Sequence, residues 1–221
     1  MDNQQERFPV VDINGHVIGS ILRGQAHDGT KILHPVVHLH VFNPQGELFL
    51  QQRPAWKDIQ PNRWDTATGG HVDYGETVEE ALYREVREEL GINEFTPVFL
   101  GKYVFEGKRE RELVYVYKTV YDGLPCPNPE ELAGGRFWSH DEIMENYHKN
   151  VFTPNFEDEY KTFFCIQPSV FVFTESYIIC ILIYIILTFL GVQLIDIFYN
   201  FASLLVLNFN YIIENQAIRY F

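Results

Sequence analysis

The fold is decided by residues Gly70–Ile92, which read GHVDYGETVEEALYREVREELGI. Thr77 and Glu80 stand three residues apart, as in the capping box that begins a helix. Gly91 suits the left-handed position that ends one. The stretch between them therefore predicts a helix over Val78–Leu90.

Carboxylates interrupt the apolar face of this predicted helix. At about 100° per residue, four residues define the stripe that faces the core: Val78, Ala81, Leu82 and Val86. Glu85 and Glu89 fall inside the stripe, and Glu88 lies at its edge. Burying like charges one turn apart is unfavourable unless a positive charge lies against them. The pattern favours a hard divalent cation, Mg²⁺ or Mn²⁺, held by oxygen ligands. The alternative is a solvated helix with Glu80–Arg84 and Arg84–Glu88 ion pairs.

The whole stretch resembles the Nudix box, Gly-x5-Glu-x7-Arg-Glu-U-x-Glu-Glu-x-Gly-U, where U is an aliphatic residue. It matches at every fixed position: Gly70, Glu76, Arg84, Glu85, Val86, Glu88, Glu89, Gly91 and Ile92. The resemblance implies an α/β fold, the Nudix-type α/β/α sandwich with a mixed sheet, over residues 1–164. It also implies an enzyme that uses Mg²⁺, or Mn²⁺, to hydrolyse a diphosphate linked to another moiety.

The same resemblance implies roles for the residues of the box. Three carboxylates are the expected metal ligands and catalytic residues, one of them a candidate base acting through a bound water: Glu85, Glu88 and Glu89. Gly70 is expected to lend its backbone carbonyl to the metal or to shape the loop so that the metal can approach. Glu76 and Arg84 are expected to brace the loop against the helix through an ion pair, and Gly91 to end the helix.

Strands are expected on both sides of the box. FPVVD and HVIGSILR flank Asn14-Gly15 and predict a hairpin, because Asn-Gly suits a type I′ turn. Further strands are expected at PVVHLHVFN, ELFLQQR, FTPVFLGKYVFE, ELVYVYKTVY and RFWS, and helices at Asp141–Asn150 and Asn155–Phe164. The stretch PAWKDIQPNRWDTATGG is expected to be a polar loop. This order of elements indicates helices packed on a mixed sheet.

Segments outside the box resemble the isopentenyl-diphosphate isomerase branch of Nudix-like proteins: AHDGTKILH, GGH and ERE. The resemblance implies a second metal site at His27, His34, His71, Glu110 and Glu112. The alternative is that His27 and His34 are an ordinary loop histidine and an ordinary strand histidine. It also implies that three basic residues grip a diphosphate: Arg23, Arg53 and Lys57. Trp64 is either a residue that stacks on the substrate or a core residue.

One position departs from the isomerases. Their catalytic cysteine would fall at Gly69, and glycine has no group that transfers a proton. Together with the intact box, this favours hydrolysis of a nucleoside diphosphate derivative or a related organic diphosphate. Two alternatives are an isomerase-like activity and a catalytically silent Nudix module that only binds its ligand.

Composition separates two parts of the chain. The net charge of −13 argues against direct binding of nucleic acid. Residues 165–221 carry only four charged residues: Glu175, Asp196, Glu214 and Arg219. Residues 176–195 carry none and are long enough to cross a bilayer as a helix, which needs about 20 residues. We therefore expect a cytoplasmic catalytic domain at 1–164 and an apolar tail at 165–221. The tail is either a membrane anchor or a product of frameshift or read-through.

Overall fold

The computed structural model describes residues 4–57 and 59–165. These belong to the first of the two units into which the chain divides, Met1–Cys165. The predicted membrane segment at 176–195, like the rest of the tail beyond Cys165, lies outside the described residues. Within the described ranges, no helix combines the length and the apolar character needed to span a membrane.

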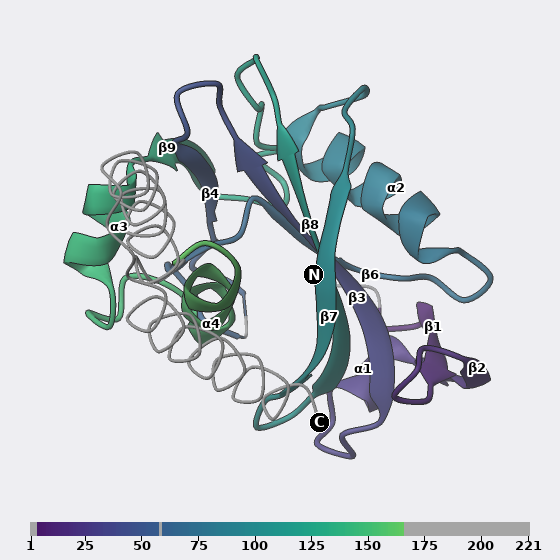
Figure 1. Ribbon diagram of the computed structural model, residues 1–221. Helices are drawn as coiled ribbons and strands as arrows, with labels where there is room; N and C mark the ends of the chain where they lie inside the picture. Colours follow the sequence, from purple (N-terminus) through teal and green to yellow (C-terminus); the bar gives the residue numbers. More distant parts are fainter. Residues whose placement is uncertain (1–3, 58, 166–221) are drawn as a thin grey trace, which may run out of the picture. The chain divides into compact units, whose positions relative to one another are not determined.

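A mixed seven-stranded sheet forms the centre of the domain (Figure 1). Its strands are β3 (Leu33–Phe42), β4 (Leu48–Gln52), β5 (Trp64–Asp65), β6 (Thr68–His71), β7 (Val98–Glu106), β8 (Arg111–Val120) and β9 (Gly134–Trp138). The main path runs β5-β4-β3-β8-β7, with β6 paired to β3 and β9 paired to β4. Strands β3 and β8 are parallel, whereas the other pairs are antiparallel. The predicted mixed sheet is confirmed.

Strand β3 changes partner along one edge. Its middle, Val36–Leu39, pairs with β6, which sets His38 opposite Gly69 and Val37 opposite Gly70. Its last two residues pair with β4 instead. The register therefore brings the glycines that begin the box against the middle of the central strand.

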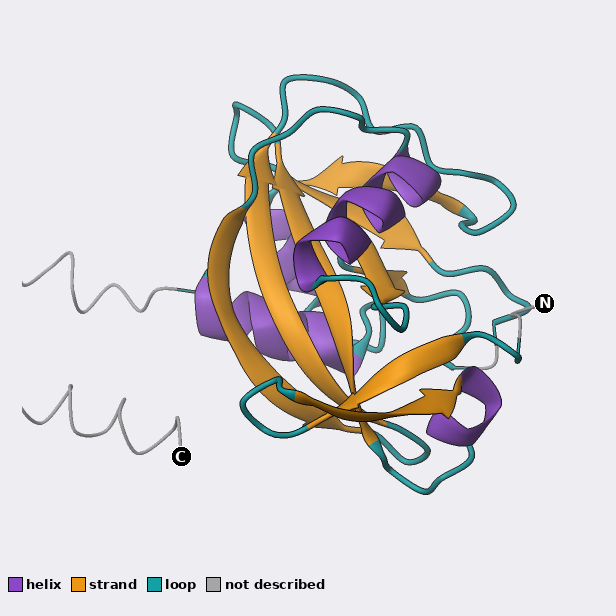
Figure 2. Cartoon of the chain, turned by 90° about the vertical axis from the view of Figure 1, so that its right-hand side faces the viewer, coloured by secondary structure: helices purple, strands orange, loops and turns teal. Residues whose placement is uncertain are grey.

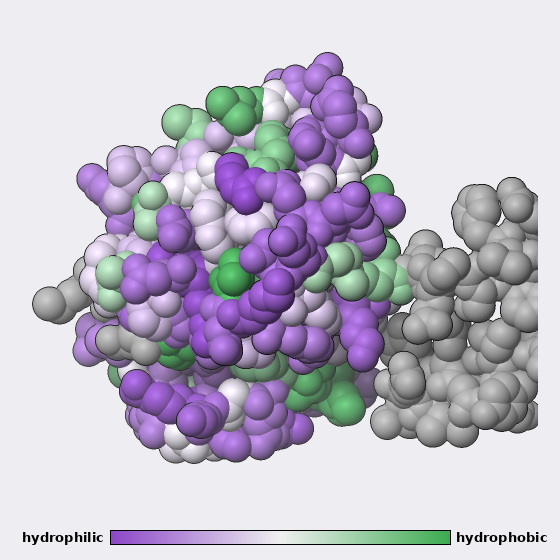
Figure 3. Space-filling model, turned by 90° about the vertical axis from the view of Figure 1, so that its left-hand side faces the viewer, coloured by the Kyte–Doolittle hydropathy of each residue, from purple (hydrophilic) through white to green (hydrophobic). Residues whose placement is uncertain are grey.

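Helices cover both faces of this sheet (Figure 1). They are α2 (Val78–Leu90) on one face and α3 (His140–Asn146) and α4 (Pro154–Phe163) on the other. One buried cluster joins α2 to β3 and β4: Val37, Leu39, Val41, Phe49, Ala81, Leu82, Val86 and Leu90 are among its members. A second joins α3 and α4 to β4 and β9: Leu48, Leu50, Trp138, Ile143, Phe156 and Tyr160 are among its members. The surface seen in Figure 3 is mostly hydrophilic, with small separate hydrophobic patches.

A smaller two-stranded sheet pairs β1 (Arg7–Val11) with β2 (Val17–Leu22) and lies on the same side of the domain as α2 (Figure 2). The short helix α1 (Arg23–Ala26) comes directly after β2 in the chain. The predicted hairpin is confirmed, but its type I′ turn is wrong. Gly15 has a φ of 92°, whereas Asn14 does not adopt the positive φ that a type I′ turn needs. The Asp12 carboxylate accepts hydrogen bonds from the backbone N–H groups of Asn14 and His16, which favours a longer loop.

Helix α2 has the predicted bounds and ends. The Thr77 hydroxyl accepts from the Glu80 N–H, and the Glu80 carboxylate accepts from the Thr77 N–H. Gly91 is left-handed, with a φ of 67°. Of the two ion pairs in the solvated-helix alternative, Arg84–Glu88 is present at 3.5 Å. Glu80 instead serves the cap, and within the described ranges it forms no ion pair with Arg84.

Two further expectations need correction. The stretch expected to be a polar loop contains β5 and β6, because β3 and β4 supply backbone partners that its polar composition does not reveal. Helix α3 ends at Asn146 rather than at Asn150, since His148 and Asn150 take positive φ values of 58° and 62°.

Candidate active site

Arg84 ties the loop after β6 to helix α2. Its guanidinium donates to both carboxylate oxygens of Glu76, each at 2.9 Å, and to the backbone oxygen of His71, also at 2.9 Å. The hydrogen bonds to Glu76 raise the pKa of Arg84 above its ordinary value. The pair closes the loop of the box onto the helix that follows it.

Glu85 lies against the α-carbon of Gly70. A Cβ at position 70 would overlap the Glu85 carboxyl group, so any other residue there would force this side chain to move. Burial raises the pKa of Glu85 above its ordinary value, although Arg84 lies 2.7 Å from its Oε1 and partly opposes the shift. The carboxylate is therefore held in a position that disfavours its charge.

Glu89, one turn further along the helix, is also a carboxyl group whose charge is disfavoured by burial. Its Oε2 atom is buried and has no hydrogen-bond partner among the described residues. Burial and the neighbouring Glu85 raise the pKa of Glu89 well above its ordinary value, and Lys57 and a backbone hydrogen bond from Gly69 only partly oppose this. Two partly buried carboxyl groups side by side, one with an orphaned buried oxygen, fit a hard divalent cation, which would favour their charged forms.

Glu88 is placed differently from these two. Its side chain is 54% exposed and lies 3.5 Å from Arg84. In the part of the chain that the structure describes, the three helix glutamates do not form a group whose ligand atoms all lie within 4.8 Å of one another. The geometry therefore draws Glu85 and Glu89 together at the helix–sheet contact and leaves Glu88 at the surface.

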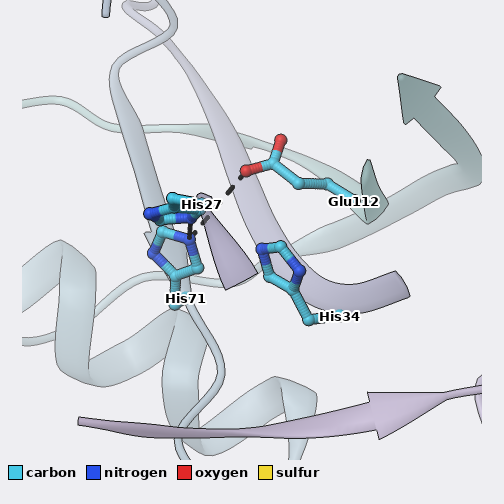
Figure 4. A group of neighbouring side chains, drawn as sticks. All are labelled: His27, His34, His71 and Glu112. Atoms are coloured by element: carbon cyan, nitrogen blue, oxygen red, sulfur yellow. Dashed lines mark hydrogen bonds and ion pairs between the residues drawn. The ribbon is translucent and has the colours of Figure 1, made fainter. Parts of the chain in front are cut away.

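A second set of ligand groups does converge. The side chains of His27, His34, His71 and Glu112 offer ligand atoms that all lie within 4.8 Å of one another (Figure 4). Nε2 of His27 lies 3.1 Å from Nε2 of His71, and Glu110 lies 3.9 Å from His27. The structure thus brings together all five residues expected at the second site.

The fold explains this convergence. Strands β3 and β8 are parallel and place His34 directly opposite Glu112, while β6 ends at His71 beside them. Nδ1 of His34 lies 2.9 Å from the Ile32 backbone oxygen, so this nitrogen carries the proton. Its Nε2 is buried without a hydrogen-bond partner in residues 4–57 and 59–165, which leaves a lone pair directed at the cluster.

Burial governs the charges of this second set. It lowers the pKa of His34 and lowers that of His71 well below the ordinary value. Burial and the neighbouring Glu110 raise the pKa of Glu112 to about 8. Neutral imidazoles with a carboxylate are a donor set that suits Mn²⁺ or Zn²⁺. The residues fit a cation.

The basic residues expected to hold a diphosphate lie near these carboxylates. Arg53 donates to the Ile59 backbone oxygen and to Asp65, and its charge acts on Glu110 and Glu112. Lys57 lies 3.5 Å from Glu131, and its charge acts on Glu89.

Arg23, the third basic residue, lies near the histidine cluster. It is 2.9 Å from Glu6, and its charge acts on His34 and His71. Trp64 packs edge-on against Trp138 at 5.1 Å, which supports the core interpretation of this residue.

Sequence analysis did not single out a buried polar network on the α4 side of the sheet. Glu159 of α4 lies 2.7 Å from His38 and 2.8 Å from His40, and the Tyr103 hydroxyl donates to it at 2.7 Å. The alternation of His38 and His40 along one strand places both on the same face. That spacing was a usable signal, whereas nothing in the sequence pointed to Glu159.

Comparisons with known proteins agree with the fold and the box. The sequence profile of the NUDIX domain matches residues 32–156. Isopentenyl-diphosphate Delta-isomerase 1 of Photorhabdus laumondii is 32% identical over 164 residues, which are 70% of this chain and 93% of the relative. An uncharacterized Nudix hydrolase of Streptomyces coelicolor is 31% identical over 157 residues, 70% of this chain and 86% of the relative. The crystal structure of DR0079 from Deinococcus radiodurans has a TM-score of 0.64 at 26% identity and covers 72% of this chain and 99% of that one.

Proposed function

Because the chain belongs to the Nudix family, we propose that it hydrolyses the diphosphate linkage of a small molecule with the help of Mg²⁺ or Mn²⁺. The substrate class is a nucleoside diphosphate derivative or a related organic diphosphate. The observation that carries this proposal is the pair of partly buried carboxyl groups, Glu85 and Glu89, at the contact between α2 and β6.

The residues around this pair have complementary tasks. A divalent cation bound here would neutralise phosphate oxygens and lower the pKa of the attacking water. Glu85 and Glu89 hold that cation, with Glu88 reaching it from the exposed side, and Glu89 is the candidate base. Arg53 and Lys57 lie where cationic side chains would attract the phosphate groups.

The histidine cluster supports a second candidate function. One relative is named an isopentenyl-diphosphate isomerase, and His27, His34, His71, Glu110 and Glu112 come together as a donor set. An allylic isomerisation also needs a group that moves a proton at carbon, and Gly69 offers none. Incubation with isopentenyl diphosphate in D₂O tests this candidate, because isomerisation incorporates deuterium whereas hydrolysis releases phosphate.

The test of the leading proposal is a panel of nucleoside diphosphate derivatives and prenyl diphosphates, assayed with Mg²⁺ and with Mn²⁺ for release of phosphate or pyrophosphate. On any substrate that is turned over, Glu89→Gln should lower kcat by about 10²–10⁴-fold, because the amide neither binds the cation as a carboxylate does nor takes a proton.

The matched control is Glu79→Gln, which makes the same change on an exposed position of the same helix. It should leave kcat unchanged. Wild-type turnover by Glu89→Gln would remove the chemistry from this helix, and absence of turnover across the whole panel would favour the silent ligand-binding module.

A further inference from the structure

The side of the sheet opposite α2 carries a polar network with an open end. Glu159 is 1% exposed and accepts hydrogen bonds from three side chains, those of His38, His40 and Tyr103. A carboxylate with three such donors is fully engaged. It fixes the ring of His38 by holding its Nδ1 atom at 2.7 Å.

The other ring nitrogen of His38 points towards Gly69. The register of β3 and β6 sets the two residues opposite each other, and a Cβ at position 69 would lie 3.3 Å from both Cδ2 and Nε2 of the ring. Gly69 itself is exposed. In the described part of the chain, Nε2 of His38 has no hydrogen-bond partner, and it is not a buried orphan. A polar atom is thus left accessible beside a strand residue that has no side chain.

Gly69 also connects this atom to the candidate active site. Its backbone N–H contributes a hydrogen bond to Glu89. It lies next to Gly70, against which Glu85 packs. The charges of Asp65 and Glu112 also act on His38 and favour its protonated form. A Cβ at position 70 would meet Glu85 and one at position 69 would meet His38, so the helix glutamates and the ring lie on opposite faces of β6. A phosphate group held at Glu89 would therefore reach the imidazole around the exposed Gly69.

We propose that His38 is a substrate-contacting residue in its imidazolium form, in which Nδ1–H donates to Glu159 and Nε2–H donates a hydrogen bond to an anionic oxygen of the bound diphosphate beside Gly69. Glu159 is its positioning residue, because it accepts from Nδ1 and so aims the opposite nitrogen at the substrate. The absence of a side chain at Gly69 is what leaves the nitrogen accessible. This inference rests on the proposed diphosphate hydrolysis and adds a determinant of substrate binding to it.

Substitutions can test the role of Nε2 of His38 apart from that of Nδ1. In His38→Asn the amide nitrogen takes the place of Nδ1 and keeps the bond to Glu159, but nothing replaces Nε2. His16→Asn makes the same change at an exposed histidine outside this network. The probe is methylenediphosphonate, a diphosphate analogue that water does not cleave, titrated calorimetrically into the full chain with Mg²⁺ present.

We expect His38→Asn to weaken probe binding by about tenfold or more, since a hydrogen bond to a charged group is lost. On a turned-over substrate, KM should rise by a similar factor with a smaller change in kcat. Gly69→Ala should give the same result, because its Cβ would cover Nε2. His16→Asn should bind the probe within about twofold of wild type, because its side chain is exposed and contacts Asp12 instead.

Equal probe affinity for wild type and His38→Asn would overturn the inference, as would a wild type that does not bind the probe. A wild type that binds the probe through His38 but hydrolyses no compound of the panel would instead overturn the proposed hydrolysis. The two failures are therefore distinguishable.

Discussion

Gly70 shows how one residue can fix the geometry of a site. Its missing side chain is required by contact, because the carboxyl group of Glu85 occupies the space that a Cβ would need. The α-carbon and the carboxylate are brought together by α2 packing on β6. Glycine here serves close approach rather than an unusual φ, since Gly70 is not left-handed.

Gly70→Ala should therefore destabilise the domain and displace Glu85. Because the clash is with the end of a side chain that can move, the loss should lie at the lower end for overpacking, about 1 kcal/mol in the free energy of unfolding, which denaturant unfolding measures. Gly19→Ala is the control, because the nearest atom to its added Cβ would be the Cβ of Val10 at an ordinary 3.8 Å. Equal stability of the two variants would show that Glu85 does not depend on the glycine.

Helix α2 depends on its first turn as an element. The Thr77–Glu80 capping box satisfies backbone N–H groups that would otherwise lack partners at the start of the helix. The helix carries Glu85 and Glu89, so the position at which it begins determines where these carboxyl groups lie relative to β6.

Thr77→Ala should lower the free energy of unfolding by about 1 kcal/mol, since the side chain no longer accepts the Glu80 N–H. Thr77→Ser keeps the hydroxyl and should match wild type. Thermal unfolding of the three proteins checks this, and an alanine variant as stable as the serine variant would speak against the cap.

Helix α4 is joined to β3 through ionisable groups. Burial alone would lower the pKa of His38, but the adjacent Glu159 carboxylate outweighs burial and raises this pKa to about 9. Burial alone would raise the pKa of Glu159. The charge of His38 and the hydrogen bonds from His38 and His40 outweigh burial and lower this pKa below its ordinary value. His38 therefore stabilises the fold fully below its ordinary pKa, and this is lost as the pH rises through about 9. Glu159 stabilises it above its ordinary pKa, and this is lost as the pH falls through the lowered value.

This linkage predicts a pH dependence of stability. Between the ordinary pKa of His38 and about 9, the free energy of unfolding of wild type should fall more steeply than that of His38→Gln, in which the titrating group is gone. Other groups, such as Glu112, titrate in both proteins, so the difference between the two curves isolates His38. Parallel curves from denaturant unfolding at each pH would contradict the assignment.

On the scale of the whole molecule, two ligand sets of different chemistry share one domain. The helix set is made of carboxylates, and the set at the junction of β3, β6 and β8 is dominated by imidazoles. Mg²⁺ prefers oxygen ligands, whereas imidazole suits Zn²⁺. A cation that binds only the folded state stabilises it by mass action.

Each cation should therefore stabilise the domain through its own set. At about 100 times its dissociation constant, a cation adds about 2.7 kcal/mol to the free energy of unfolding. Scanning calorimetry should show that Glu89→Gln loses the rise in Tm with Mg²⁺ but keeps that with Zn²⁺. His34→Ala should show the reverse pattern. If both variants lose both increases, the two sets are not independent.

Local sequence determined the elements that carry their own signals. Thr77, Glu80 and Gly91 define the ends of α2, and these act through hydrogen bonds and backbone conformation within a few residues. The turn at Asn14-Gly15 escaped prediction because the neighbouring Asp12 competes for the backbone N–H groups. Strands β5 and β6 escaped it because their partners lie elsewhere in the chain.

By itself, the sequence determined that carboxylates share the apolar face of one helix and that the chain carries an intact Nudix box, since both depend on spacing along a single segment. Only the tertiary structure decided that Glu85 meets Gly70, that His27, His34, His71 and Glu112 meet one another, and that Glu159 holds His38. These contacts join residues that are far apart in the chain. Their distances are set by strand register and by the packing of helices on the sheet, which no local pattern encodes.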